Sequence, residues 1–274
     1  MVIAPGRARR PGAFVGAIEE PTPEELESCP FCEGREDRTP PETDAIAYVE
    51  RQPDTPGWKI RVVPNLYPAL ERQEVVIHSP RHVRTLADLD DDQLSLIGTI
   101  WKSHFVQAEA KGLYVHAMIN EGRFAGASLP HSHSQLVWLR EPPPAVVGER
   151  SDDCVICELL ADESLRIGEQ DEIVAMAHPA GRAPFELLIG HRHHNPVPGA
   201  LNLSAALSLL RAAVRRLRQL EGPVPWNAWV HQGPHWHLEV VPRLTVFAGL
   251  ELGAEIYVNV VEPQRAAAAL RDGL

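Results

Sequence analysis

Two pairs of cysteines have a type and spacing that could support metal chemistry. Cys29 pairs with Cys32 and Cys154 with Cys157, and each pair encloses two intervening residues. This spacing lets both thiolates of a pair reach one ion, and zinc prefers about four thiolate and imidazole ligands. We therefore expect each pair to supply two ligands of a zinc site. A redox role is less favoured because neither pair lies in a thioredoxin-like βαβ context.

The remaining zinc ligands should be histidines, because the chain holds 13 of them in a few short clusters. For the first site we choose His82 and His131. For the second site we choose His194 and His235, which occupy matching places in a repeated pattern. The long separations from the cysteine pairs exclude a small zinc finger. The alternative interpretation is buried free cysteines beside unrelated histidines.

His133 has a different predicted role. Side chains two residues apart on a strand point to the same face, so His131, His133 and Gln135 should share a face. If His131 binds metal, His133 stays free, and a neutral imidazole is a good nucleophile toward a phosphoryl group. The Gln135 amide can donate to phosphoryl oxygens without adding negative charge. We predict that His133 and Gln135 are catalytic; the alternative for His133 is a solvated strand histidine.

The second half of the chain repeats the first in order. Residues 75–82 recur as 187–194, and residues 130–135 recur as 234–239. Glu239 stands where the first copy has Gln135, and its carboxylate would repel a phosphate. The chemistry is therefore expected in the first copy, with a structural or partner-forming role for the second.

The same element order is predicted for both copies, with short strands, one long helix and two further strands. Strands are expected near 45–50, 59–64, 74–78, 113–119 and 134–139, then near 172–177, 185–190, 226–231 and 236–241. Apolar periodicity predicts helices over 94–108, with Asp88 or Asp90 as its cap and Gly112 as its end, and over 203–217, stopping before Gly222. A last strand near 255–261 and a helix from about 263 complete the chain.

This pattern predicts an α+β fold of two duplicated halves, with an antiparallel sheet and one long helix per half. The expected halves are residues 1–145, with the catalytic histidine, and 146–274. They meet in a proline-rich and charged segment, residues 141–153, and are not expected to fold independently.

Composition limits the partners. A net charge of −11 argues against nucleic acid, because binding to it rests on neutralising phosphates. No apolar run approaches the roughly 18 residues that span a membrane, and no secretory signal is evident, so we expect a cytoplasmic protein. A small anionic ligand remains possible. The arginines at 7, 9 and 10 and the small-residue loop 120–128 could approach its phosphates.

These motifs resemble the galactose-1-phosphate uridylyltransferase family, a branch of the histidine-triad superfamily, over nearly the whole chain. The segment from Cys29 to Cys32, the run from Ser79 to His82 and the segment around His133 match its metal and nucleophile motifs. The resemblance implies that further residues bind the substrate, namely Arg7, Arg10, Asn65, Asn120, Gly126 and Ser128. It also implies a homodimer in which Glu251, in segment 249–253, reaches the sugar in the partner's site.

The resemblance further implies a ping-pong reaction in galactose metabolism. His133 would take a nucleoside monophosphate, UMP in the named family, from a nucleotide sugar and pass it to a sugar 1-phosphate. Structural zinc, one or two ions per chain, would hold the active strand. Ser132 replaces the usual Pro between the two histidines, as in the ADP-glucose phosphorylase branch, where phosphate is the acceptor. Glu121 replaces a common Lys and would add negative charge near the phosphates.

Three alternatives remain open. The first is a nucleotide-sugar or dinucleotide phosphorylase that uses the same His133. The second is a histidine-triad hydrolase, which is less favoured because those proteins carry another histidine where Gln135 stands. The third, from another class, is a non-catalytic zinc-stabilised nucleotide-binding protein. It is less favoured because the chain has both His133 and Gln135.

Overall fold

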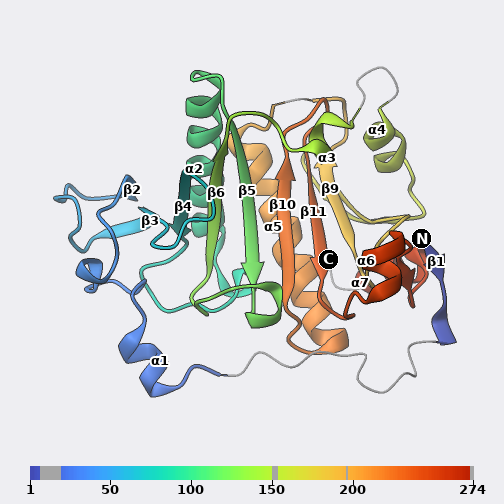
Figure 1. Cartoon of the computed structure of the whole chain (residues 1–274), viewed down its shortest axis with the longest axis horizontal. Coiled ribbons are helices and arrows are strands. Elements are labelled where there is room, and N and C mark those ends of the chain that lie inside the picture. Colours follow the sequence, from blue (N-terminus) through green and yellow to red (C-terminus); the bar gives the residue numbers. More distant parts are fainter. Residues whose placement is uncertain (7–19, 150–153, 196, 272–274) are drawn as a thin grey trace.

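Ten antiparallel strands form one continuous sheet in this computed structural model, which describes residues 1–6, 20–149, 154–195 and 197–271 (Figure 1). The first half supplies β2 (Asp44–Ala47), β3 (Trp58–Pro64), β4 (Arg72–Ile77), β5 (Tyr114–Glu121) and β6 (His133–Leu139). The second half supplies β7 (Arg166–Gln170), β8 (Ile173–Ala177), β9 (Leu187–His191), β10 (Trp226–His231) and β11 (His237–Pro242). The order across the sheet is β2-β3-β4-β6-β5-β10-β11-β9-β8-β7. Outward from the central β5–β10 pair, both halves have the same order, which agrees with the predicted duplication.

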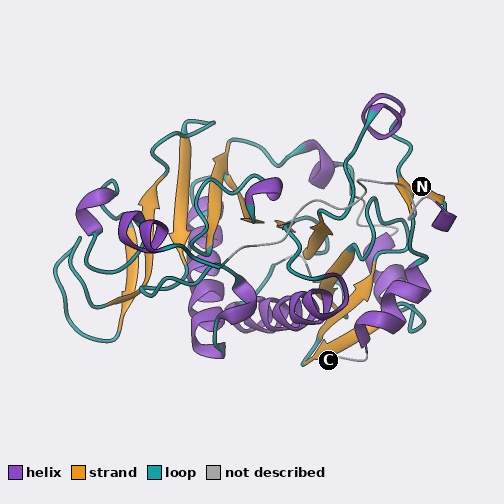
Figure 2. Cartoon of the chain, turned by 90° about the horizontal axis from the view of Figure 1, so that it is seen from below, coloured by secondary structure: helices purple, strands orange, loops and turns teal. Residues whose placement is uncertain are grey.

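One long helix per half packs behind the sheet in the view of Figure 1, as predicted. α2 (Asp91–Glu109) begins at Asp90, whose carboxylate accepts from the Gln93 N–H at 2.8 Å, and α5 (Ala200–Glu221) ends at Gly222. Of the two predicted caps, Asp90 is therefore the one used. The helices meet closely (Figure 2), and a Cβ on Gly98 of α2 would lie 3.1 Å from the backbone nitrogen of Ser204 in α5.

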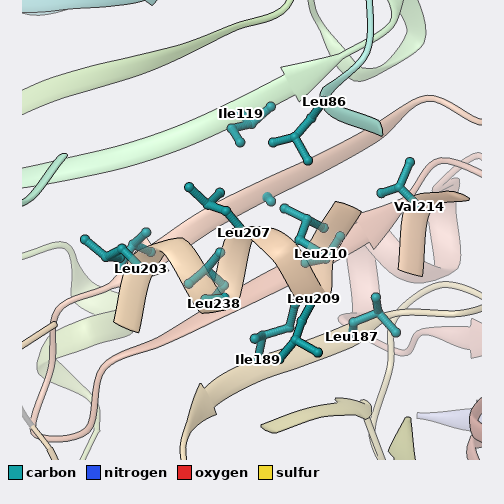
Figure 3. Packing of buried hydrophobic residues seen from close by; sticks show 14 of the residues in the cluster. Leu86, Ile119, Leu187, Ile189, Leu203, Leu207, Leu209, Leu210, Val214 and Leu238 are labelled. Carbon is teal, nitrogen blue, oxygen red and sulfur yellow. The ribbon is translucent and has the colours of Figure 1, made fainter. Parts of the chain in front are cut away.

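The largest apolar cluster joins the two halves. Leu207 and Leu210 of α5 are fully buried with Ile119 of β5, while Leu209 packs with second-half residues such as Ile189 (Figure 3). Arginines of α5 add hydrogen bonds to the first half at η3 (Leu86–Asp88) and just after it. Arg215 Nε donates to Ala87 O at 2.7 Å, and Arg211 Nη1 donates to Leu89 O at 3.1 Å. The shared core agrees with halves that do not fold independently, and the boundary near residue 145 stays a prediction.

The sheet has two chemically different faces on β6. Ser134 and Leu136 point toward α2, where the Trp101 Nε1–H donates to Ser134 Oγ at 3.0 Å. Because strand side chains alternate, His133 and Gln135 lie on the opposite face, which the long helices leave uncovered. That face carries the candidate chemistry.

The structure corrects the sequence-based expectation in several places. β7 was not expected, because a short edge strand with one buried apolar residue lacks apolar alternation. β9 starts at Leu187 and not at 185, because Phe185 has a positive φ of 61°. The strand expected over 255–261 is reduced to β12 (Val258–Asn259), which pairs in parallel with β1 (Val2–Ile3) outside the main sheet.

Several short helices were also not expected. They are α1 (Pro23–Ser28), α3 (Pro144–Val147), α4 (Val155–Leu160), α6 (Gly249–Ala254), η2 (Glu36–Arg38), η3 and η4 (Arg123–Ala125). The last helix, α7 (Pro263–Arg271), begins where it was predicted. Among the described residues, every helix is too short or too polar to cross a membrane.

Candidate active site

The fold brings the four predicted ligands of the first metal site together. Cys29 and Cys32 flank the turn after α1, and His131 directly precedes β6 on the neighbouring part of the sheet. The Cys29 sulfur lies 3.4 Å from His131 Nδ1, and the Cys32 sulfur lies 3.5 Å from His82 Nδ1. All four donor atoms lie within 4.8 Å of one another. One ion could therefore bind all of them.

The chemistry of this donor set fits zinc. Two thiols and two imidazoles match a structural tetrahedral site. The Nε2 atom of each histidine already has a polar partner. His131 Nε2–H donates to Ser79 O at 2.9 Å, and His82 Nε2 contacts Glu25 Oε1 at 2.7 Å. This leaves both Nδ1 atoms facing the sulfurs, as expected for histidine ligands oriented by a second partner. Burial and the adjacent Cys29 raise the pKa of Cys32 to about 12, so a cation is needed to hold a thiolate there.

The second predicted set is also assembled, but it is more open to solvent. The Cys154 sulfur lies 3.4 Å from His235 Nδ1, and the Cys157 sulfur lies 3.7 Å from His194 Nδ1. These four donors again lie within 4.8 Å of one another, and His194 is exposed. Both sets could hold a metal.

His133 begins β6 directly beside the first metal cluster. Its Nδ1 lies 2.7 Å from the carbonyl oxygen of His131, which can only accept, so the proton sits on Nδ1 and the lone pair on Nε2. Burial lowers the pKa of His133, so the ring is neutral at neutral pH. Phe31, from the turn between the first cysteines, meets this ring edge-on with centroids 5.5 Å apart. The arrangement presents one unprotonated nitrogen from a fixed ring.

A cavity of about 270 Å³ adjoins His133. Its walls include Gln135, Asn65 and Ser128, three residues predicted from the sequence to act on the substrate. The Gln135 carbonyl oxygen accepts from Asn65 Nδ2 at 3.4 Å. The cavity also has apolar walls from Phe31 and Val63, so it combines a nucleophile and amide groups with apolar surface.

The start of the predicted phosphate-binding loop lines a second, small pocket beside His133. Asn120, at the end of β5, lines a small pocket together with His131 and His133. The loop then turns through Gly122 and Gly126, with φ angles of +85° and +91°. A Cβ on Gly122 would lie only 2.9 Å from Pro225 Cβ, so this turn requires glycine for both its backbone angle and its packing. Gly126 directly follows η4 and adopts the left-handed backbone conformation.

Three other predicted substrate-binding residues stay predictions. Arg7 and Arg10 lie outside the described residues. Glu251 lies in α6, where its carboxylate accepts from the Ala248 N–H at 2.9 Å, and it does not line the cavities beside His133. Its predicted role in a partner's site stays a prediction.

Glu121 also lines the small pocket beside His133, and its predicted effect on the phosphates stays a prediction. Glu121 follows Asn120 on β5, so its side chain points to the opposite, helix-covered face. There it is buried and accepts from Thr85 Oγ1 at 2.6 Å and from Trp226 Nε1 at 2.9 Å. Burial raises the pKa of Glu121 to about 7, although these donors oppose the shift.

The second half contains a counterpart of the site with different chemistry. His237 Nδ1 contacts His235 O at 3.0 Å, as His133 contacts His131. Glu239, however, is paired with Arg182, and Arg182 also binds Glu186 at 2.6 Å. An ion pair thus stands where the first half has neutral Gln135, which agrees with placing the chemistry in the first half.

Sequence reasoning missed several polar residues around these sites. Glu25, which contacts His82, lies in the unexpected helix α1, although Thr22 followed by a proline and two acidic residues is a helix-start signal. A third cluster, formed by Glu149, His231 and His237, was also missed because its members are far apart in the sequence. In it, the His231 Nδ1–H donates to Glu149 at 2.5 Å and Nε2 accepts from Trp229 Nε1 at 2.8 Å.

Comparisons with known proteins give consistent results. The model of the galactose-1-phosphate uridyl transferase N-terminal domain matches residues 67–143. ADP-glucose phosphorylase of Arabidopsis thaliana is 32% identical over 323 residues, covering 99% of this chain and 89% of that protein. A galactose-1-phosphate uridylyltransferase of Thermotoga maritima is 25% identical over 287 residues, covering 89% of both.

Solved structures agree with the fold described above. The structure of ADP-glucose phosphorylase from Arabidopsis thaliana with bound ADP-glucose superposes with a TM-score of 0.82 and 30% identity. That match covers 98% of this chain and 94% of the other. A uridylyltransferase structure matches with a TM-score of 0.77 and 25% identity, covering 94% of each chain.

Proposed function

The chain belongs to the galactose-1-phosphate uridylyltransferase family, and from this premise we propose that it transfers a nucleoside monophosphate through His133. The donor is ADP-glucose and the acceptor is inorganic phosphate. The choice of donor and acceptor is supported by the greater identity to an ADP-glucose phosphorylase, 32%, than to a uridylyltransferase, 25%.

One observation carries the chemical part of this proposal. His133 is held with Nδ1 bonded to the His131 carbonyl and is buried at the wall of a cavity that Gln135 also lines. A fixed neutral imidazole with a free lone pair is the group required for attack on phosphorus. A neutral amide beside it can donate to the phosphoryl oxygens as charge develops on them.

The reaction has two displacements. In the first, His133 Nε2 forms a bond to the α-phosphorus of ADP-glucose, and the bond to glucose 1-phosphate breaks. In the second, a phosphate oxygen attacks the same phosphorus and the bond to His133 Nε2 breaks, which forms ADP and restores the His133 lone pair. Both leaving groups depart without a protonated carboxyl group, and the Gln135 amide stabilises the phosphoryl oxygens in each step.

The second candidate is transfer of UMP between hexose 1-phosphates, a reaction of galactose metabolism. The family match over residues 67–143 and the relative from Thermotoga maritima favour it. The two candidates share the His133 intermediate and differ in the nucleotide base and in the acceptor.

Zinc is the proposed metal in both cysteine–histidine clusters. Cys29, Cys32, His82 and His131 would hold one ion, and Cys154, Cys157, His194 and His235 a second. When bound, zinc supplies a fixed cross-link between distant segments, which stabilises the fold and not the reacting phosphate. The grouping of donor atoms within 4.8 Å supports this assignment.

A homodimer in the cytoplasm is the proposed setting. Exposed apolar side chains around α6 support a dimer, because such side chains gathered on a surface favour protein contact. They include Val246, Leu250, Leu252 and Ile256. A Leu252→Asp variant that sediments as a monomer, while the wild type sediments as a dimer, would agree with contact through this surface.

Product analysis with paired substrates tests the proposed reaction. The enzyme is incubated with ADP-glucose and phosphate, and separately with UDP-glucose and galactose 1-phosphate, and products are separated by anion exchange. We expect ADP and glucose 1-phosphate, with kcat/KM at least about tenfold above the uridylyl reaction. The reverse preference would favour UMP transfer, and turnover of neither pair would contradict both.

A further inference from the structure

Two amide side chains near the site take no part in the displacement steps. Gln73 lies on β4, is 9% exposed, and donates from Nε2 to the Gln135 carbonyl oxygen at 2.5 Å. Asn227 lies on β10 of the second half, directly opposite Asn120, and donates from Nδ2 to Asn120 Oδ1 at 2.7 Å. Each holds the oxygen of an amide that faces the site.

Backbone groups fix which end of Gln73 points to Gln135. The Ala69 N–H lies 2.9 Å from Gln73 Oε1, and because a backbone N–H can only donate, that end of the amide must be the oxygen. The NH₂ end of Gln73 therefore faces Gln135, and the Gln135 carbonyl oxygen accepts this hydrogen bond. Asn65 adds a second donor to this oxygen at 3.4 Å, and its own direction is fixed by the Tyr67 N–H on Asn65 Oδ1 at 2.9 Å.

The orientation of the Asn120 amide is fixed in a similar way, but here the fixed backbone group is a carbonyl oxygen and not an N–H. Asn227 Nδ2 lies 2.7 Å from the Ala125 carbonyl oxygen, which can only accept. The NH₂ end of Asn227 therefore lies between Ala125 and Asn120, and Asn120 presents its oxygen to Asn227. The NH₂ group of Gln135 therefore points away from Gln73, and the NH₂ group of Asn120 points away from Asn227.

We propose that Gln73 and Asn227 are positioning residues that orient the Gln135 and Asn120 amides so that NH₂ groups, and not oxygens, meet the transferred phosphoryl group. A phosphoryl group offers only acceptor oxygens, so a reversed amide would bring one lone pair against another. The two ends of an amide have almost the same shape, so packing alone cannot choose between them. The hydrogen bonds to Ala69 and Ala125 make that choice.

This inference rests on the proposed function and is tested by a double-mutant cycle. Gln73→Met and Gln135→Met are made singly and together, and the rate of nucleotidyl-enzyme formation from ADP-glucose is measured in single turnovers at saturating donor. Gln73→Met should slow the wild type by about tenfold, the effect of one hydrogen bond of moderate strength. In the Gln135→Met background it should cause no further slowing, because it acts only through Gln135.

A matched control separates positioning from general damage. Gln232 also donates from a partly buried amide to a backbone carbonyl, Val115 O at 2.5 Å, but it lines a different cavity from the two beside His133. Gln232→Met should leave the rate of nucleotidyl-enzyme formation unchanged. A parallel cycle of Asn227→Leu with Asn120→Leu should show the same loss of effect in the double variant.

Two results would overturn the inference. One is equal slowing by Gln73→Met in both backgrounds, which indicates a structural effect. The other is no slowing in the wild-type background. If the wild type itself forms no nucleotidyl adduct, the proposed function fails, and the cycle is then measured as the dissociation constant for AMP. The orientation role would still be supported if Gln73→Met weakens AMP binding in the wild-type background but has no effect on it in the Gln135→Met background. Unchanged AMP binding in the wild-type background would overturn it.

Discussion

The carbonyl oxygen of His131 accepts a hydrogen bond from His133 Nδ1 at 2.7 Å. The same residue, His131, directs its side chain toward the sulfurs of Cys29 and Cys32, at 3.4 Å and 3.8 Å. One residue therefore connects the candidate metal site to the candidate nucleophile. Ordering of the first cluster should fix both the tautomer and the position of His133.

Exchange of the amide and carboxylate between the two halves should separate their roles. Gln135→Glu replaces a donor with an anion at the phosphoryl group, so adduct formation should fall by at least about a hundredfold, as when an oxyanion donor is lost. Glu239→Gln should leave that rate within about threefold, because Glu239 is paired with Arg182 in the other half. Single-turnover rates check both values. Equal losses in the two variants would contradict the assignment of chemistry to the first half.

The two metal sites should differ in their effect on activity. Cys32→Ser and Cys157→Ser should each lower zinc content by about one ion per chain, because each removes a thiolate ligand. Only Cys32→Ser should strongly slow adduct formation, because Phe31 in the same turn lies against the His133 ring. Elemental analysis and single-turnover rates check this prediction. Wild-type protein with well under one zinc per chain would exclude both sites.

Glu121 should make folding stability fall as the pH rises. Burial raises the pKa of Glu121 in the folded chain to about 7 from an ordinary value of 4.5, so the unfolded chain releases this proton first. The stabilising contribution is complete below pH 4.5, is lost as the pH rises through about 7, and amounts to about 3 kcal/mol. Urea unfolding between about pH 5 and pH 8 should show a steeper decline for wild type than for Glu121→Gln. Parallel curves, or a wild-type stability that rises relative to the variant, would contradict this.

The sequence predicted the parts of the fold that periodicity and repetition reveal. The long helices α2 and α5, most strands of the large sheet and both cysteine–histidine sets follow from regular spacing and from the internal repeat. α1 and β7 were missed because short, exposed elements carry little apolar periodicity.

The polar contacts across strands could not be predicted in the same way. Asn227 and Asn120 become neighbours only through the register between β10 and β5, which one residue of slip would change. Glu121 shows the same limit, because its single-residue offset from Asn120 sends it to the helix-covered face. The resemblance to the family suggested a charge near the phosphates, and strand alternation turns the Glu121 carboxylate away from the face of Asn120.

Intact-mass measurement of the enzyme mixed with ADP-glucose, without phosphate, tests the central claim most directly. The account predicts one acid-labile adduct with the mass of AMP on each wild-type chain, because the phosphorus–nitrogen bond to His133 forms and no acceptor removes the nucleotide. His133→Gly should show no adduct, and His237→Gly, its counterpart in the second half, should retain it. An adduct that persists in His133→Gly, or a wild-type chain that forms none with ADP-glucose or UDP-glucose, would contradict the account.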